Sequence, residues 1–337
     1  MTSGMNAIDA VRPFAEEQRS IPDDLALAVL HLDADLLPDL LAVTNRLRIN
    51  RFENVVRLCS IINARNGLCG ENCRFCAQSA HYETPARQVY SMLPPEEIQA
   101  GYDQASERPI EFFSIVTSGG KLAKQDVEAA ILAMQADATQ KVADGQEPVQ
   151  WCASLGGLSE AEFVRLKEAG LVRYHHNLES AESFYGDICT THSYQDRIGT
   201  IRRAKAAGLN VCSGALLGMG ESLEQRVELA DALSKEDVDS IPLNFLIPIP
   251  GTPMADRPIM SPVEILLAVA MFRLKNPASD LRIAGGRQHL GRLQSALFWA
   301  GCNGLMIGDL LTTAGHDVDE DVAMIRSLGL VPSRELG

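Results

Sequence analysis

Three cysteines lie close together in one short segment, with the spacing C-x3-C-x2-C, at Cys69, Cys73 and Cys76. Three thiolates on one loop can hold three irons of a cubic 4Fe–4S cluster, and the fourth iron then has no protein ligand and can bind another molecule. A structural zinc site uses four protein ligands, and the nearest candidate after Cys76 is His81. The spacing therefore favours a cluster, and the alternatives are a zinc site with a distant fourth ligand and buried structural cysteines.

The composition limits the classes of protein to which the chain can belong. It has 337 residues, of which 46% are hydrophobic and 22% charged, as in a globular protein with a large core. The net charge of −14 argues against nucleic acid or an anionic membrane as a partner, because both need basic patches. The longest apolar run, Ile265 to Phe272, is too short to cross a bilayer. Eight cysteines and no visible amino-terminal signal predict a reducing, cytoplasmic location.

Strand-like and helix-like segments alternate without a break after about residue 50. Eight such units predict an α/β fold of the TIM type, a (β/α)8 barrel over residues 51–337, with a helical extension over residues 1–50. An open doubly wound sheet is the alternative, but it would more often carry a glycine-rich nucleotide loop after its first strand, and the sequence has none there. The predicted strands are 55–63, 111–117, 149–154, 172–177, 210–216, 240–247, 281–284 and 304–307.

Chemistry in such a barrel takes place at the carboxyl ends of the strands, and the three-cysteine loop follows the first predicted strand. Cys152, Cys212 and Arg282 lie on the third, fifth and seventh predicted strands, which can point side chains into one interior layer. A buried guanidinium needs an anionic partner, and a second cluster with its thiolates would supply one. The alternative for each cysteine is a small hydrophobic core residue, and this is what we expect of Cys189 and Cys302.

The three-cysteine loop, with the aromatic Phe75 directly before its third cysteine, resembles the signature of the radical S-adenosylmethionine enzymes. In these enzymes the amino and carboxylate groups of S-adenosylmethionine occupy the open iron. From about Leu58 to Pro332, an ordered set of motifs resembles the biotin synthase family. These motifs are Asn63-Ala64-Arg65-Asn66-Gly67-Leu68-Cys69, Cys76-Ala77-Gln78-Ser79, His176-Asn177-Leu178-Glu179-Ser180, Tyr194-Gln195-Asp196-Arg197, Val211-Cys212-Ser213-Gly214, Gly218-Met219-Gly220-Glu221, Asn244, Gly251-Thr252-Pro253 and Arg282-Ile283-Ala284-Gly285-Gly286-Arg287.

The resemblance implies the insertion of one sulfur between two unactivated carbons of dethiobiotin, which gives biotin. The implied cofactors are a 4Fe–4S cluster, S-adenosylmethionine and an auxiliary iron–sulfur cluster, usually 2Fe–2S, that donates the sulfur. Cleavage of S-adenosylmethionine would give a 5′-deoxyadenosyl radical, which abstracts the hydrogens, so the cofactors carry the difficult chemistry. The implied partners are dethiobiotin, an electron donor such as flavodoxin or ferredoxin, and a second copy of the chain in a homodimer.

The family holds its auxiliary cluster with three cysteines and one arginine, and Cys152, Cys212 and Arg282 fall on three of these positions. The remaining position falls on Ser114, where many members have cysteine. A serine alkoxide binds iron less readily than the softer thiolate. Our hypothesis is that Cys59, on the neighbouring strand, replaces the missing thiolate and that the cluster is then larger or rearranged. The alternative is that Cys59 is a core residue.

Four further residues receive roles from the resemblance. Arg197 would bind the carboxylate of S-adenosylmethionine through a bidentate contact. Asn177 and Glu179 would contact the ribose and the substrate, although many members have Asp at the second of these positions. Asn244 would hold the ureido ring of the substrate or the nucleoside. The alternatives are an exposed helix charge for Arg197 and a core amide for Asn244.

The remaining candidates surround the cofactor and the substrate. Gly119 and Gly120 would let the backbone approach the methionyl amino group, because close approach needs glycine; an ordinary turn is the alternative. Phe75 is a candidate for cofactor binding, and Arg65, which stands where many members have Lys, is a candidate for substrate binding.

Two other functions remain as alternatives. One is a radical enzyme with a single cluster, like a hydrogenase maturase or an isomerase, that acts on another small molecule. Cys152, Cys212 and Arg282 argue against it, because such an enzyme has no need of that layer. The other is a non-catalytic iron–sulfur or zinc carrier, which would need neither an eight-unit barrel nor Arg197.

Overall fold

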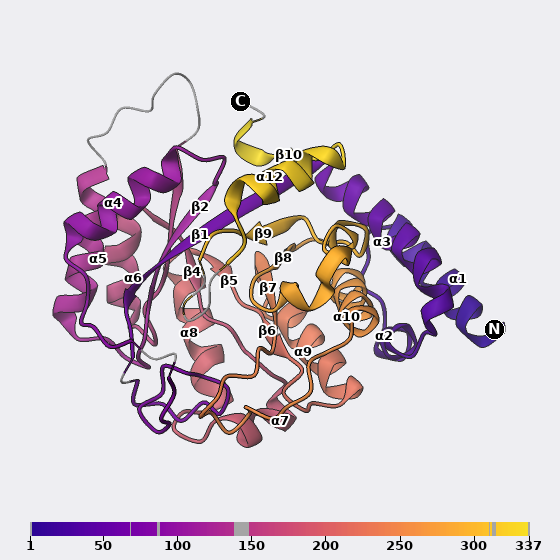
Figure 1. Cartoon of the computed structure of the whole chain (residues 1–337), viewed down its shortest axis with the longest axis horizontal. Coiled ribbons are helices and arrows are strands. Elements are labelled where there is room, and N and C mark those ends of the chain that lie inside the picture. Colours follow the sequence, from indigo (N-terminus) through magenta and orange to yellow (C-terminus); the bar gives the residue numbers. More distant parts are fainter. Residues whose placement is uncertain are drawn as a thin grey trace.

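The computed structural model describes residues 2–67, 69–85, 88–137, 148–309, 311 and 315–335. Its strands form a barrel of eight parallel positions, closed by pairing between β9 and β1 (Figure 1). Chain order is kept around the barrel, and β5 and β6 share one position because both pair with β7. The strands are β1 (Val55–Arg65), β2 (Phe112–Thr117), β3 (Gln150–Ser154), β4 (Leu171–His175), β5 (Asn210–Cys212), β6 (Ala215–Leu217), β7 (Ser240–Phe245), β8 (Asp280–Ile283) and β9 (Gly304–Met306).

The predicted barrel is confirmed, and the predicted fifth strand is divided at Ser213 and Gly214. The division follows from the close approach of this segment to β7. A Cβ atom on Gly214 would lie 1.9 Å from the carbonyl oxygen of Pro242, so only glycine fits here. The Gly214 N–H then donates to Asn177 Oδ1 at 3.1 Å, and its carbonyl oxygen accepts from the Glu179 N–H at 3.0 Å. The break therefore turns the backbone toward the end of β4.

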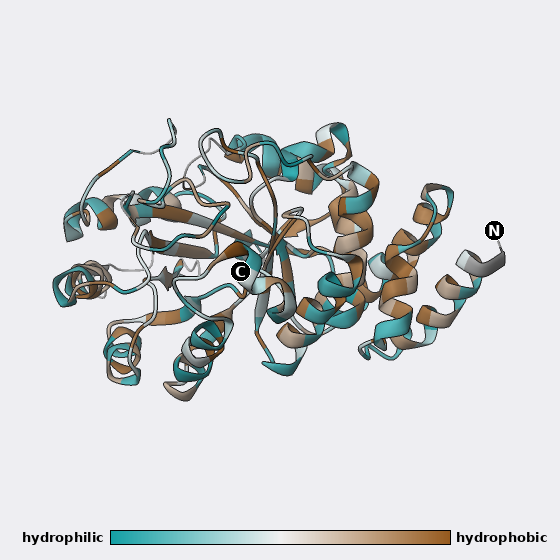
Figure 2. Ribbon diagram, turned by 90° about the horizontal axis from the view of Figure 1, so that it is seen from below, coloured by the Kyte–Doolittle hydropathy of each residue, from teal (hydrophilic) through white to brown (hydrophobic). Residues whose placement is uncertain are grey.

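Helices cover the outside of the barrel, and Figure 2 shows both hydrophobic and hydrophilic colours along them. Capping boxes start three of them, with Ser159, Ser193 and Ser222 as the N-cap residues. The helices that follow β1 to β8 are α4 (Pro95–Ser106), α5 (Lys124–Asp137), α6 (Glu160–Glu168), α7 (Glu182–Ile188), α8 (Tyr194–Ala206), α9 (Leu223–Lys235), α10 (Pro262–Lys275), η2 (Arg287–Leu293) and α11 (Ala296–Trp299). After β9 come α12 (Val318–Ser327), β10 (Val331–Pro332), which pairs with the start of β1, and η3 (Ser333–Glu335).

The predicted amino-terminal helices are present as α1 (Thr2–Glu16), α2 (Asp23–Leu30), η1 (Ala34–Leu36) and α3 (Leu37–Phe52). They pack against one side of the barrel, over α9, α10 and α11 (Figure 1). Helix α10 is consequently buried from Ile265 to Lys275, as expected of a helix that is covered on all sides. Lys275 Nζ lies 2.6 Å from Asp23 Oδ1, which ties the extension to α10. The division of the chain into units at residue 50 stays a prediction.

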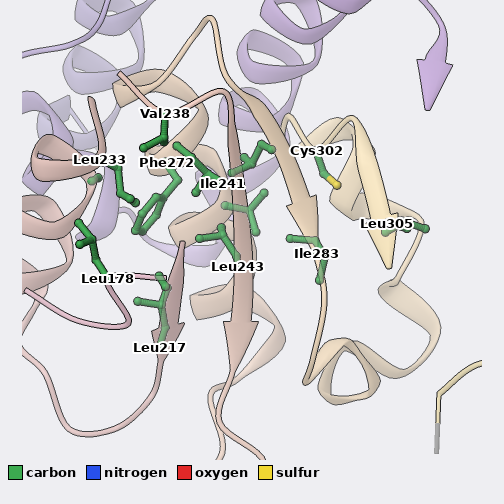
Figure 3. Close-up of a cluster of buried hydrophobic side chains, with 14 of the residues drawn as sticks. Leu178, Leu217, Leu233, Val238, Ile241, Leu243, Phe272, Ile283, Cys302 and Leu305 are labelled. Atoms are coloured by element: carbon green, nitrogen blue, oxygen red, sulfur yellow. The ribbon is translucent and has the colours of Figure 1, made fainter. Parts of the chain in front are cut away.

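The outer face of the strands packs against α9 and α10. Figure 3 shows Ile241 and Leu243 of β7 beside Phe272 of α10 and Leu233 of α9. Burying one such side chain stabilises the fold by about 1.5–3 kcal/mol, so this layer holds the strands rigidly. Cys302 lies in the same core, and its thiol donates to the carbonyl oxygen of Gly304 at 2.9 Å, in agreement with a structural role. Among the described helices, none combines the length and the apolar character needed to cross a membrane.

We expect Gly214→Ala to lower the free energy of unfolding by about 1–3 kcal/mol, because the added methyl group has no room beside Pro242. Urea unfolding followed by circular dichroism measures the change. Gly186→Ala in α7 is the matched control, since no atom lies within 4 Å of its added Cβ and alanine favours a helix. Equal stability of Gly214→Ala and the natural chain would contradict the close approach.

Candidate active site

A cavity of about 370 Å³ lies inside the barrel at the carboxyl ends of its strands. One part of its wall is formed by Phe75 and Cys76 of the three-cysteine loop. Another part is formed by Cys212 of β5 and Arg282 of β8, which belong to the predicted interior layer. One cysteine from each of the two sets that the sequence singled out, Cys76 and Cys212, therefore lines this cavity.

The loop after β1 presents its three thiols from a fixed backbone. The N–H of Cys69 donates to the carbonyl oxygen of Gln78 at 3.0 Å, and the N–H of Cys76 donates to that of Cys73 at 3.0 Å. The Gln78 amide is itself held by Asn66 Oδ1 at 2.7 Å. The hydrogen bond between Cys76 and Cys73 closes a turn, and the hydrogen bond from Cys69 to Gln78 joins the start of the loop to its end. Burial raises the pKa of Cys76 to about 11, so the thiol stays neutral until a metal displaces its proton.

Arg197, Asn177 and Glu179 form one group on the cavity wall. Arg197 donates from Nη1 to the carbonyl oxygen of Asn177 at 2.8 Å and from Nε to the hydroxyl of Tyr185. Burial alone would lower the pKa of Arg197, but Glu179, Tyr185 and Cys73 together outweigh burial and raise the pKa above its ordinary value. Burial raises the pKa of Glu179, and Arg197 opposes that rise. The guanidinium is therefore held charged at the cavity, where it can meet a carboxylate.

Asn244 on β7 also lines the cavity, and both ends of its amide have partners. Its Nδ2 donates to the carbonyl oxygen of Ala215 at 3.3 Å, and its Oδ1 accepts from the Gly285 N–H at 2.9 Å. The amide thus links β6 to the segment after β8. One N–H and one lone pair remain for a ligand.

Arg65, Gly119 and Gly120 are not among the residues that line the cavity. Arg65 Nη1 donates to Asp126 Oδ2 at 3.0 Å. A Cβ on Gly120 would meet Glu71 Oε1 at 2.0 Å, so this glycine permits a contact within the protein. The ligand contacts expected of these three residues stay predictions.

Below the cavity, Cys59, Cys152 and Cys212 lie buried together with Arg282. Arg282 Nη1 donates to the sulfur of Cys59. Burial raises the pKa of the Cys59 thiol, and Arg282 opposes the rise. The hydroxyl of Ser114 is also buried, and it has no hydrogen-bond partner among the described residues. The predicted residues are thus brought together, with Cys59 rather than Ser114 in contact with the arginine.

Two charged residues of this layer were not singled out by the sequence analysis. Arg173 of β4 pairs in register with Cys152, and its guanidinium lies 4.0 Å from the centre of the Phe112 ring. Asp280 lies 3.6 Å from Arg173, 3.9 Å from Arg282 and 3.3 Å from Arg57. Arg173 could have been found from the sequence, because it is a charged residue at an inward position of a short, mostly apolar strand.

The layer fits an anionic iron–sulfur cluster. Arg173 Nε and Nη1 and Arg282 Nε and Nη2 are buried and have no hydrogen-bond partner among the described residues. Unpartnered buried donors are costly, and the only carboxylate in contact with both arginines among the described side chains is Asp280. Thiolates and sulfides beside these donors would satisfy them. His175, whose Nε2 is also without a described partner, faces the same cavity.

We expect Asp280→Asn to destabilise the metal-free chain by about 3–5 kcal/mol, because it leaves buried guanidinium groups without their counter-ion. Burial alone would raise the pKa of Asp280, but Arg282, Arg57 and Arg173 hold it below its ordinary value. The ionised carboxylate therefore adds stability above the unfolded pKa of 3.8, which is lost as the pH falls through the lower folded pKa.

Urea unfolding at a series of pH values measures both effects. The decline in stability below pH 3.8 should be smaller in Asp280→Asn than in the natural chain. Asp319→Asn on the exposed start of α12 is the control for a lost carboxylate. Equal pH profiles for Asp280→Asn and the natural chain would contradict the assignment.

Comparison with known proteins identifies the family of this chain. The Radical SAM superfamily model matches residues 63–233, and the model of the Biotin and Thiamin Synthesis associated domain matches residues 242–331. The biotin synthase of Maridesulfovibrio salexigens is 48% identical over 313 residues, which are 92% of this chain and 93% of that protein. The biotin synthase of Trichlorobacter lovleyi is 42% identical over 334 residues, covering 98% and 97%.

Solved structures share the fold. Methylornithine synthase superposes with a TM-score of 0.82 at 19% identity, covering 97% of this chain and 98% of that one. The FeFe-hydrogenase maturase HydG from Carboxydothermus hydrogenoformans gives 0.79 at 16% identity, covering 98% and 80%. At these identities the superpositions show the fold alone, whereas the sequence matches show the family. The cysteine loop, the interior layer and the extent of the matches lead to one conclusion: the chain belongs to the biotin synthase family of radical S-adenosylmethionine enzymes.

Proposed function

We propose that this chain is an enzyme that inserts sulfur into dethiobiotin to form biotin, with S-adenosylmethionine as cosubstrate. The observation that carries the proposal is that Cys76 lines the same cavity as Cys212 and Arg282. A reaction that needs a radical source and a sulfur source requires both to reach the same substrate. A cavity of about 370 Å³ between the two sites meets that requirement.

The cysteine loop and the interior layer would hold the two inorganic groups. Cys69, Cys73 and Cys76 would bind a 4Fe–4S cluster, and Cys152, Cys212 and Arg282 would bind the auxiliary cluster. When bound, these groups supply the electron that cleaves S-adenosylmethionine and the sulfur that enters the substrate. The protein supplies position and exclusion of water, because the layer below the cavity is completely buried.

The polar groups on the wall would orient the two organic molecules. Arg197 faces the cavity as a charged guanidinium beside the loop and would bind the methionyl carboxylate. Asn177 and Glu179 would bind ribose hydroxyls and the substrate, and Phe75 would pack against the cofactor. The free N–H and lone pair of Asn244 match a ureido group, which has both a donor and an acceptor. Arg65, Gly119 and Gly120 keep their predicted contacts as part of this proposal.

We assign the fourth auxiliary ligand to Cys59 rather than Ser114. Two observations support this choice: Cys59 accepts the hydrogen bond from Arg282, and it belongs to the same buried cluster as Cys152. A thiolate also binds iron more readily than an alkoxide does. Cys59 lies on β1, whereas Ser114 lies on β2, so the ligands enclose a differently shaped site. The number of irons that this site holds is therefore a quantity to be measured. Flavodoxin or ferredoxin as electron donor, a homodimer and a cytoplasmic location complete the proposal.

The first experiment is Mössbauer spectroscopy on an anaerobically reconstituted variant with Cys69→Ala, Cys73→Ala and Cys76→Ala. This variant cannot hold the radical-generating cluster, so the iron that remains belongs to the interior layer. We expect a cluster signal from that iron. Its absence would overturn the sulfur-donor role and favour a radical enzyme with a single cluster and another substrate. Biotin formation from dethiobiotin by the natural chain is the companion assay.

In the same background, we expect Cys59→Ala to lose the auxiliary iron and Ser114→Ala to keep it. The reason is that, of these two residues, Cys59 is the one that contacts Arg282. Iron analysis and Mössbauer spectroscopy measure the difference. Cys302→Ala removes another buried thiol, which has its own hydrogen bond outside this layer, and is the matched control. Full auxiliary iron in Cys59→Ala would contradict the ligand assignment.

A further inference from the structure

The segment after α7 places a thiol and an imidazole beside the three-cysteine loop. Cys189 ends the helix with an extended backbone, φ −154° and ψ 139°. Its sulfur lies 3.7 Å from that of Cys73. His192 is also close to this sulfur, with Nδ1 at 3.3 Å and Nε2 at 3.8 Å. The ligand atoms of Cys73, Cys189 and His192 all lie within 4.8 Å of one another.

These distances fit the edges of a tetrahedral metal site. Zinc binds thiolate sulfur at about 2.3 Å and imidazole nitrogen at about 2.0–2.1 Å, so tetrahedral angles place two sulfurs about 3.8 Å apart and sulfur and nitrogen about 3.6 Å apart. The observed separations are 3.7 Å from sulfur to sulfur and 3.8 Å from sulfur to Nε2. Two edges of the site therefore already have tetrahedral lengths, and the third joins Cys73 and His192, whose ligand atoms lie within 4.8 Å of each other.

Glu71 orients the imidazole for this role. Its Oε2 lies 2.8 Å from His192 Nδ1, so we assign the proton to Nδ1, which donates to the carboxylate. That tautomer leaves the lone pair of Nε2 free. A carboxylate behind a histidine is the common arrangement in metal sites, because it fixes the ring and makes the ligating nitrogen more basic.

The backbone around the three ligands is already fixed. Asn72 Oδ1 accepts from the N–H groups of Thr190 at 2.9 Å and Thr191 at 3.3 Å. On the other side of Cys73, the Arg74 N–H donates to the carbonyl oxygen of Ile188 at 2.9 Å. These contacts join the cysteine loop to the segment between α7 and α8 on both sides of the cluster of thiols. Because this backbone is already ordered, the binding of an ion would cost little further conformational entropy.

We propose that Cys73, Cys189 and His192 bind one divalent cation of the zinc or ferrous type when the loop carries no cluster. Each thiol releases its proton to solvent as the ion binds, and a water takes the fourth position. Cys73 belongs to both sites, and its loss to a cluster leaves only two ligands for the ion. The two occupants therefore exclude each other. Only this exclusion rests on the proposed function; the ion site itself does not.

The test uses the full-length chain with Cys69→Ala and Cys76→Ala, stripped of metal by a chelator under anaerobic conditions. Co²⁺ is the probe, because thiolate-bound tetrahedral Co²⁺ gives sulfur-to-cobalt charge-transfer bands and strong visible bands. The spectrum of the same chain with Cys73→Ala is subtracted to remove cobalt bound to the interior layer. We expect a difference spectrum of a tetrahedral site with thiolate ligands.

Adding Cys189→Ala or His192→Ala should abolish that difference spectrum, and Glu71→Gln should weaken cobalt binding by about 10–100-fold. Cys302→Ala, which removes a buried thiol elsewhere, should leave it unchanged. Circular dichroism establishes that each variant is folded. A difference spectrum that is absent, or that survives Cys189→Ala in a folded chain, would overturn the proposal.

A second measurement tests the exclusion in the chain that retains all three loop cysteines. Zn²⁺ added before Fe²⁺ and sulfide should slow the appearance of cluster absorbance, and Cys189→Ala should remove most of this delay. An equal delay in both chains would place zinc on the three-cysteine loop alone and overturn the proposal. If no cluster forms even without zinc, the proposed function fails while the cobalt result still decides the ion site.

Discussion

The buried positive charge inside the barrel is the constraint on which the rest of this structure depends. Arg173 and Arg282 lie within a closed ring of parallel strands, and both are buried. Asp280 supplies one negative charge to this layer, and a buried guanidinium without a counter-ion is strongly destabilising. Three thiols sit among these charges. The interior therefore suits an anionic group. The negative charge of such a group would neutralise the positive charge that Asp280 leaves on the two arginines.

The barrel joins that interior to the open end by simple geometry. Side chains alternate along each strand, so inward positions two residues apart lead from the charged layer toward the cavity. On β4 and the residues after it, this sequence runs from Arg173 through His175 to Asn177. The break in the fifth strand at Gly214 then fixes the Asn177 amide. The strands that hold the polar side chains of the cavity are thus the same strands that are fixed by packing on their outer face.

The sequence predicts the strands well, because strand-like and helix-like runs are local signals, and their number predicts the barrel. It also predicts most of the site by residue type, since three close cysteines and a strand-borne arginine have few uses. It could not place Cys189 next to Cys73, because the two are 116 residues apart and meet only through the end of α7. Nor does the pair Gly119 and Gly120 reveal what approaches it, and the structure places Glu71 there. Partners across the fold are set by packing, which a single sequence does not encode locally.

The packing of the amino-terminal helices onto α10 has a consequence for biosynthesis. Asp23 and Lys275 are 252 residues apart, so a ribosome releases the first helices long before their binding surface exists. Until α10 is made, the surfaces of α2 and α3 that pack against it are uncovered, and α10 itself carries the apolar run Ile265 to Phe272. Contacts between such distant segments form late and slow the final folding step. The surfaces that α2, α3 and α10 bury against one another therefore stay exposed until most of the chain has been made.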